Sequence, residues 1–418
     1  MHNSALTFPK GFLWGVATSA HQIEGGNKNN QWWKAESERR IKNGDTSEIA
    51  CDHWNRYEED FAFLTEMNLN AYRFSLEWSR VFPEPGEKDP EAIEHYHKMI
   101  DALLKRKITP FLTLHHFTHP IWLEQLGGLK NQKRCLEHFK QYVELVADEF
   151  HDKIGHWNTI NEPGVVSVFG YFSGHYPPFE TSMRGAIRAA NTLMRMHAVA
   201  YHALKQIDAH AKVGLVKNLP IFMPLNLRSR RDRLATRIVD YLFTGASFRA
   251  LRTGKSTWGL IRRNKLLRDS SDFLGLNYYT FALVSQKNPD LVESTTLNVD
   301  PELLCADLGW EPYPEGLLLN LRRLQREFPN LPIYITENGI GTNDDPWRQQ
   351  LLIDHLKMTH QALQEGIDVR GYFHWSLLDN FEWVSGYSPR FGLVHVDYTT
   401  QQRTMKESSN LYAAIAKH

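Results

Sequence analysis

Short apolar runs alternate with amphipathic stretches along the whole chain. Amphipathic helices are expected most clearly over 91–106, 133–150, 185–207, 314–328 and 346–365. The apolar runs are rich in β-branched and aromatic residues and are bounded by turn residues, so they predict buried strands. These runs cover 12–18, 71–76, 109–115, 156–161, 212–217, 272–279, 332–336 and 369–375. Eight strand-then-helix units predict an α/β fold in which parallel strands close into a (β/α)8 TIM barrel.

The chain of 418 residues has no low-complexity linker and no internal repeat. Barrels of this class reach such a length as one domain when their βα loops carry insertions. We therefore expect a single barrel domain over 1–418. The order of elements is hardest to assign in 219–271, a basic stretch that contains Arg228, Arg230, Arg231 and Arg233.

Charge and cysteine content narrow the function classes. Lys+Arg and Asp+Glu balance at 48 each, which gives no electrostatic case for a nucleic-acid or membrane partner. Cys51, Cys135 and Cys305 have no paired spacing, so they indicate neither a disulfide framework nor a metal site. The N-terminal residues lack the apolar core of a signal peptide, and no run of 18 apolar residues occurs. We expect a cytoplasmic protein.

Two glutamates stand where predicted strands end. Glu162 lies in HWNTINEP at 156–163, and Glu337 lies in PIYITENG at 332–339. The carboxyl ends of parallel barrel strands converge on one face, where such folds carry their chemistry. Two converging carboxylates are the minimum needed to cleave a glycosidic bond.

Other polar and aromatic residues also fall at or near the carboxyl ends of the predicted strands. Each has an ordinary alternative, because a lone histidine is more often structural and a tryptophan more often belongs to the core. Their joint placement around one rim favours a site. These residues are Gln22, Arg73, His116, Asn161, Asn277, Tyr279, Trp375, Glu382 and Trp383.

Longer motifs carry a resemblance to a known family over nearly the whole chain. They are FPKGFLWGVATSAHQIEG at 8–25, TINEP, GLNYY, DLGWEPYPEGL, ITENG, and GYFHWSLLDNFEWVSGYSPRFG at 371–392. The last segment is long and highly specific. The chain thus resembles glycoside hydrolase family 1, the retaining β-glucosidases and β-glycosidases.

The resemblance implies a role for each candidate residue. Glu337 would be the nucleophile and Glu162 the acid/base, with no metal or organic cofactor. The sugar would be held by Gln22, His116, Asn161, Glu382 and Trp383 above a Trp375 platform, while Arg73, Asn277 and Tyr279 would orient and charge-stabilise Glu337. Apart from the resemblance, we expect Trp310, in DLGWEP, to line the entrance and stack on the aglycone, with packing on the scaffold as an equal alternative.

The two carboxyl groups must play opposite roles at one pH. The Arg73 guanidinium and Tyr279 hydroxyl would favour an ionised Glu337. Partial burial and the charge of Glu337 would raise the pKa of Glu162, so that it starts protonated. The expected substrates are small β-glycosides or oligosaccharides, such as aryl glycosides and cellobiose-like sugars, with glucose, galactose and fucose left open. Transglycosylation also stays open.

The sequence departs from the family pattern at positions expected on the outer rim of the site. Phe117 and Thr118 stand where the family often has Trp-Asp, and Leu129 replaces the tryptophan of a Gly-Gly-Trp motif. The chain is also short for the family, and we expect the segments around 219–271 and 285–300 to be the ones that are shortened. These changes bear on leaving-group preference more than on the chemistry.

Three other functions are less well supported. A 6-phospho-β-glycosidase is disfavoured because Glu382 and Trp383 would repel and crowd the phosphate. A thioglucosidase is disfavoured because the acid/base carboxylate, Glu162, is present. A catalytically inactive sugar-binding barrel is disfavoured because both carboxylates and their supporting residues are intact.

Overall fold

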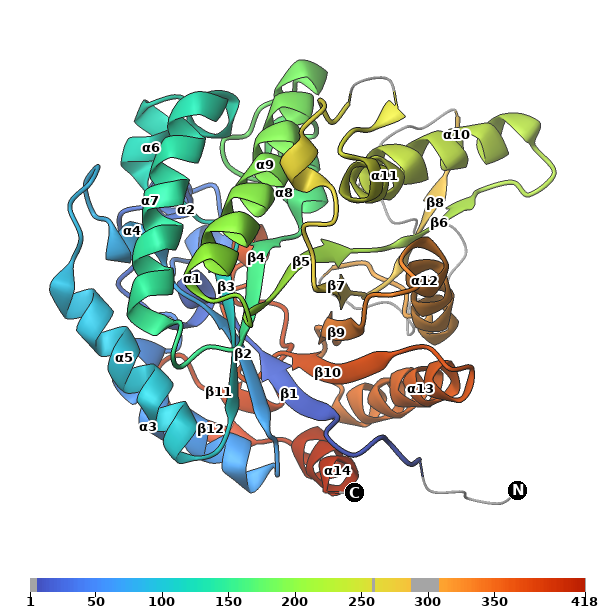
Figure 1. The fold of residues 1–418 in the computed structure, drawn as a ribbon. Coiled ribbons are helices and arrows are strands. Elements are labelled where there is room, and N and C mark those ends of the chain that lie inside the picture. The colour runs from blue at the N-terminus through green and yellow to red at the C-terminus, as the bar shows by residue number, and fades with distance from the viewer. Residues whose placement is uncertain (1–5, 258–259, 287–307, 418) are drawn as a thin grey trace.

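Eight parallel strands form a closed barrel in the computed structural model, which describes residues 6–257, 260–286 and 308–417 (Figure 1). Around the barrel the order is β1-β2-β3-β4-β5-β7-β9-β10, and β10 pairs with β1 to close it. The expected barrel is thus confirmed, with every predicted strand present. The strands are β1 Leu13–Ala17, β2 Ala71–Ser75, β3 Thr109–His115, β4 His156–Asn161, β5 Lys212–Asn218, β7 Phe273–Asn277, β9 Ile333–Asn338 and β10 Val369–Trp375.

Two predicted strand ends are wrong by two residues. The seventh strand, expected to end at 336, continues to Asn338 in β9. Tyr279 was expected inside the sixth strand, but β7 ends at Asn277. Pairing between β7 and β9 stops where Asn277 faces Glu337. The chain then leaves the barrel, so Tyr279 belongs to the loop above it.

Helices surround the strands (Figure 1), and all five predicted amphipathic helices are present within two residues at each end. Capping side chains define several starts; Asp89 and Asn131, for example, accept backbone N–H groups at the beginning of α5 and α7. The helices are α1 Ala20–Ile23, α2 Gln31–Ser37, α3 His53–Glu66, α4 Trp78–Val81, α5 Pro90–Lys105, α6 Ile121–Gln125, α7 Gln132–Phe150, α8 Pro163–Tyr171, α9 Met183–Ile207, α10 Arg230–Asp240, α11 Ala246–Thr253, α12 Pro314–Glu327, α13 Asp345–Gln364 and α14 Glu407–Ala416.

The inside of the barrel is packed with aromatic rings. The ring of Phe111 lies 5.1 Å from that of Phe373 and 5.4 Å from that of Phe273, measured between centroids. Gly15 and Gly214 make room for these rings, because a Cβ there would lie 2.5 Å from Phe373 and 2.4 Å from Phe273. The filled interior leaves the carboxyl ends of the strands as the place for a site.

The basic stretch that resisted assignment forms an insertion beside the barrel. β6 (Ile221–Pro224) pairs in parallel with β8 (Phe281–Val284) in a separate two-stranded sheet. α10, a π-helical turn at Tyr241–Gly245 and α11 follow β6. The trimming expected at 285–300 lies almost wholly outside the described residues.

A second small sheet follows the last barrel strand, where β11 (Val394–Val396) pairs antiparallel with β12 (Arg403–Met405). No helix in the described part of the chain is long and apolar enough to cross a membrane.

Candidate active site

A cavity of about 70 Å³ opens at the carboxyl ends of the barrel strands. It brings together nine of the predicted site residues: His116, Asn161, Glu162, Tyr279, Trp310, Glu337, Trp375, Glu382 and Trp383. The other three, Gln22, Arg73 and Asn277, are fully buried and contact residues of the cavity wall.

Glu337, near the end of β9, is surrounded by donors. Arg73 Nη1 forms an ion pair with Glu337 Oε1, and Tyr279 Oη donates to Glu337 Oε2 at 2.6 Å. The second guanidinium nitrogen of Arg73, Nη2, donates to Asn161 Oδ1 at 2.6 Å, which fixes the plane of the guanidinium. Charge-assisted bonds of this kind favour an ionised carboxylate.

Glu162 follows β4 directly and precedes α8, which begins at Pro163. Its backbone is left-handed, with φ of 47°, a conformation that costs a residue with a side chain roughly 1–2 kcal/mol. The Glu162 N–H bonds to Val216 O of β5 at 3.0 Å, which helps to hold this turn and directs the carboxyl group to the cavity.

The environment of Glu162 opposes ionisation. Burial, and after it the negative charge of Glu337, raises the pKa of Glu162 to about 8. A hydrogen bond from Asn277 and the charge of Arg73 act in the opposite direction but do not outweigh burial. At neutral pH, Glu162 therefore holds a proton that it can donate.

Asn277 was expected to orient Glu337, but its side chain bonds Glu162 instead. Its Nδ2 donates to Glu162 Oε1 at 2.7 Å and to Asn161 Oδ1 at 3.2 Å. The reason lies on the neighbouring strand, where the Thr336 hydroxyl donates to Asn277 Oδ1 at 2.7 Å. This bond turns the amide NH2 toward the end of β4 and away from Glu337.

Further polar groups lie along the β10 side of the cavity. Gln22 Nε2 donates to Asn380 Oδ1 and Phe381 O, both at 2.9 Å, and more distantly to Glu382 Oε2 at 3.3 Å. Burial, followed by the charge of Glu337, raises the pKa of Glu382 to about 8. Glu382 is therefore mainly protonated at neutral pH, so it can donate as well as accept hydrogen bonds.

Flat rings form the rest of this wall. The His116 ring is nearly parallel to those of Trp375 and Trp383, at centroid distances of 5.7 and 6.2 Å. Burial holds the pKa of His116 well below its usual range, so the ring is neutral. His116 Nε2 lies 3.2 Å from Asn161 Nδ2, while Nδ1 has no partner among the described residues.

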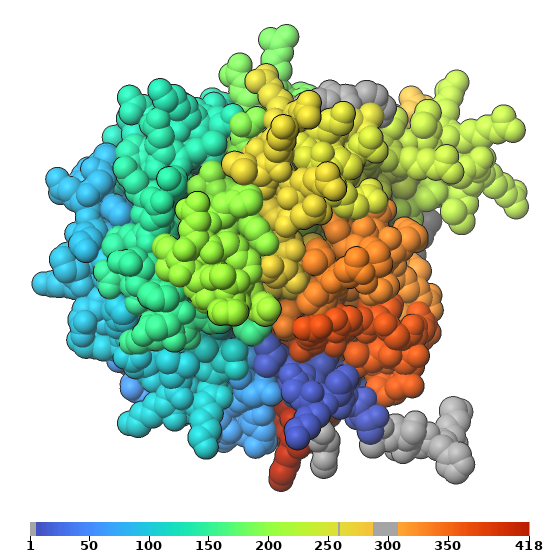
Figure 2. All heavy atoms as spheres, in the orientation of Figure 1, coloured from blue at the N-terminus to red at the C-terminus, as the bar shows by residue number. Residues whose placement is uncertain are grey.

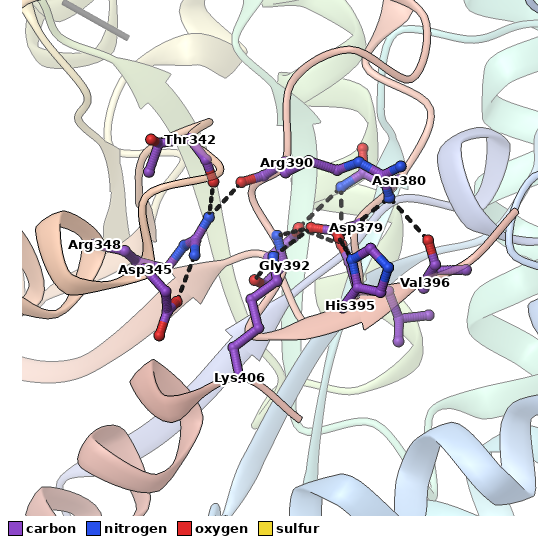
Figure 3. Close-up of polar contacts among 12 residues, drawn as sticks. Thr342, Asp345, Arg348, Asp379, Asn380, Arg390, Gly392, His395, Val396 and Lys406 are labelled. Carbon is purple, nitrogen blue, oxygen red and sulfur yellow. Dashed lines mark hydrogen bonds and ion pairs between the residues drawn. The ribbon is translucent and has the colours of Figure 1, made fainter. Parts of the chain in front are cut away.

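A buried carboxylate anchors the loop that carries Glu382 and Trp383 (Figure 3). Asp379 accepts hydrogen bonds from Gly392 N at 2.9 Å and Lys406 Nζ at 2.8 Å, and it also contacts Arg390 and His395. Although burial opposes ionisation, the His395 hydrogen bond and the Lys406 charge hold the pKa of Asp379 at about 2. Asp379 thus ties the loop after β10 to the β11–β12 sheet.

Sequence reasoning missed part of the cavity wall. Asn218 directly follows the predicted strand over 212–217, so its position at a strand end could have singled it out. The other missed residues are apolar or aromatic and lie outside the eight predicted strands, so they carry no such signal. These further lining residues are Phe117, Val165, Phe169, Tyr176, Asn218 and Phe391.

Trp310 lies at the margin of the cavity, with its ring 5.5 Å from that of Tyr279 and 6.3 Å from that of Phe391. It is half-buried, so one part of it packs on the scaffold and another faces the cavity. In the described residues no three or more His, Cys, Asp or Glu side chains are grouped to hold a metal ion.

Comparisons with known proteins agree with this geometry. Beta-glucosidase A of Thermotoga maritima is 35% identical over 98% of each chain. The solved beta-glycosidase from Pyrococcus horikoshii is 40% identical, with a TM-score of 0.90 over 99% of this chain and 95% of that one. Beta-glucosidase from T. maritima in complex with glucoimidazole is 34% identical, with a TM-score of 0.92 over 99% of both chains. The model of glycosyl hydrolase family 1 matches residues 4–418, and the chain belongs to this family.

Proposed function

We propose that Glu337 is the nucleophile and Glu162 the acid/base of a retaining hydrolysis of terminal β-D-glucosyl residues. Membership of the family makes the chain a retaining β-glycosidase. One observation carries the assignment of the two roles. Glu337 is held by a cation and a hydroxyl, whereas burial and a negative neighbour keep Glu162 protonated.

In the first step, the ionised Glu337 attacks the anomeric carbon while Glu162 gives its proton to the departing glycosidic oxygen. The leaving group departs as a neutral alcohol, and the sugar remains as an ester of Glu337. The transition state resembles an oxocarbenium ion. Asn161, fixed through Arg73 and Asn277, is placed to bond the sugar 2-hydroxyl, and such a bond strengthens in the transition state.

In the second step, Glu162 acts as a base. Esterification removes the negative charge of Glu337, so the pKa of Glu162 falls and it becomes a carboxylate. It takes a proton from water, whose oxygen attacks the anomeric carbon from the face that the aglycone left. The product keeps the β configuration, and Glu337 leaves as a carboxylate stabilised by Arg73 and Tyr279.

The aglycone side is apolar. A second cavity of about 100 Å³ shares Val165, Phe169, Asn218 and Trp310 with the first. Its remaining wall contains Phe222, Phe243, Phe281 and Ala282. Aromatic surface of this kind suits aryl aglycones and the apolar face of a second sugar, so we infer that aryl β-glucosides and cellobiose-like sugars are the substrates.

A 6-phosphorylated sugar is a poorer fit, although not for the reason the sequence suggested. Glu382 is mainly protonated at neutral pH, which weakens the expected charge repulsion. The stronger argument is that no described residue lining the sugar cavity is a lysine or an arginine. A phosphate would lose its hydration without gaining a cation.

Azide rescue of two variants tests the assignment. In Glu337→Ala, azide takes the place of the nucleophile and should give the α-glucosyl azide. In Glu162→Ala, azide should attack the glycosyl-enzyme and give the β-glucosyl azide. The same anomer from both variants, or near wild-type activity of Glu337→Ala without azide, would overturn the two roles.

The proposal extends to the whole chain as one catalytic domain and to a cytoplasmic location. The first is supported by a family match that spans nearly every residue. The second is consistent with Cys51 and Cys135, which are buried free thiols, as in a reducing compartment. Limited proteolysis followed by native mass spectrometry tests the single domain. Cell fractionation tests the cytoplasmic location.

A further inference from the structure

The insertion beside the barrel carries a surface that the glycosidase reaction does not use. Figure 1 shows α10 at the edge of the molecule, and in Figure 2 the side chains of this yellow-green segment project into solvent. We call it the α10 surface, and define it by the exposed residues Leu225, Leu227, Arg228, Arg230, Arg231, Arg233, Leu234, Arg237, Ile238 and Leu242.

The exposed apolar residues of α10 form a stripe opposite its buried face. Asp232 and Thr236, one turn apart, are buried against the rest of the insertion. Leu234 lies two residues after Asp232, which is about 200° around a helix of 3.6 residues per turn. Leu234 is 60% exposed, and Ile238, one turn further on, is 41% exposed.

The segments just before and just after α10 carry further exposed apolar residues. Leu242, in the π-helical turn that follows, is 43% exposed, and Leu225 and Leu227, in the preceding turn, are 42% and 75% exposed. Five exposed large apolar side chains within one segment of 18 residues are unusual on a monomeric protein and mark a surface that contacts something.

Five arginines accompany the stripe: Arg230, Arg233 and Arg237 lie along one side of it, Arg231 lies on the same face as Ile238, and Arg228 lies in the preceding turn. Within the described part of the chain, none of the five forms an ion pair with a carboxylate. The two acidic residues of α10 are otherwise engaged, since Asp232 accepts from Gln286 N at 3.0 Å and Asp240 pairs with Arg323. The balanced net charge of the chain therefore conceals a local excess of positive charge here.

We propose that the α10 surface docks on an anionic lipid surface, with the helix lying in the plane of the interface. A helix with an apolar stripe bordered by arginines matches this partner, because the side chains enter the headgroup boundary while the guanidinium groups meet phosphates. Docking of this kind needs no helix that crosses the bilayer, and it is independent of the glycosidase assignments above.

Two other partners fit the charges less well. A second copy of the chain seated on the same surface would bring ten arginines together without acidic partners, which like-charge repulsion opposes. A nucleic acid would match the arginines but would leave the Leu234 and Ile238 stripe in water.

Flotation with lipid vesicles tests the proposal on the full-length protein. Vesicles of phosphatidylcholine with 30% phosphatidylglycerol should carry the protein to the top of a sucrose gradient, and vesicles of pure phosphatidylcholine should not. An arginine near an anionic surface changes the partition coefficient by about fivefold. The triple variant Arg230→Glu, Arg231→Glu and Arg233→Glu should therefore lower the partition coefficient onto the anionic vesicles by at least about a hundredfold.

A second variant, Leu234→Ser with Ile238→Ser, tests the apolar stripe and should also lose flotation. The matched control is Leu104→Ser with Leu319→Ser. These leucines are 40% and 42% exposed but lie outside the α10 surface, so this double variant should float as the wild-type protein does. All variants should keep wild-type hydrolysis of a soluble aryl β-glucoside, which shows that they fold.

Three results would overturn the proposal. The first is equal flotation of the wild-type protein on neutral and anionic vesicles. The second is flotation of the charge-reversed or serine variants at the wild-type level. The third is analytical ultracentrifugation that finds a dimer for the wild-type protein and a monomer for the serine variant. A second copy of the chain would then occupy the α10 surface.

Discussion

Replacing Glu337 with glutamine should lower the pKa of Glu162 without touching Glu162 itself. Burial and the Glu337 charge together raise that pKa to about 8, with burial the larger cause. In a retaining site the two carboxyl groups stand roughly 5.5 Å apart. At an effective dielectric constant of about 20, two charges at that distance interact by about 3 kcal/mol, which is about 2 pKa units.

In the Glu337→Gln variant, the pKa of Glu162 should therefore fall by about 2 units, to about 6. The value stays above that of a free glutamate because burial persists. Carbon-13 NMR of δ-labelled glutamate follows the titration, and Glu337→Gln combined with Glu162→Gln identifies the signal. A Glu162 pKa that stays within about half a unit of the wild-type value would refute the reasoning, because burial alone would then set it.

Three further predictions follow from named contacts. Asn277 stabilises the charged form of Glu162, so Asn277→Ala should move the alkaline limb of kcat/KM above its wild-type position near pH 8, and an unchanged limb would contradict that contact. Trp310→Ala should raise KM for aryl glucosides several-fold more than it changes the inhibition constant of a glucose-sized inhibitor, and equal effects would assign Trp310 to the scaffold. Asp379→Asn leaves Lys406 short of a buried partner and should cost about 3–5 kcal/mol in urea unfolding, together with a higher KM; a loss below about 1 kcal/mol would mean that solvent replaces the contact.

The sequence predicted the barrel well because its strands are nearly continuous apolar runs between turn residues. The strand starting at Thr109, for instance, has its expected bounds. The two glutamates proposed as catalytic could be found for the same reason, since parallel strands bring their carboxyl ends to one face. The order of the strands tells which residues meet at the barrel rim, and the apolar runs give the strand ends to within about two residues.

Side-chain direction could not be predicted in the same way. Asn277 reaches the correct site but bonds Glu162, because a hydroxyl from Thr336 on the next strand sets the orientation of its amide. Phe391 belongs to a loop with no periodic pattern, and only the folded chain shows that it lines the cavity. The α10 surface was visible as a basic stretch, but its apolar stripe appears only when the helix face is known.

Covalent trapping tests the central claim, that Glu337 is the nucleophile, most directly. A 2-deoxy-2-fluoro-β-glucosyl fluoride has a good leaving group but a destabilised second transition state, so the glycosyl-enzyme should accumulate. Peptide mapping by mass spectrometry should find one fluoroglucosyl group, on Glu337 in ITENG, with loss of activity in parallel. A label on another residue, or inactivation of the Glu337→Gln variant at the wild-type rate, would contradict the account.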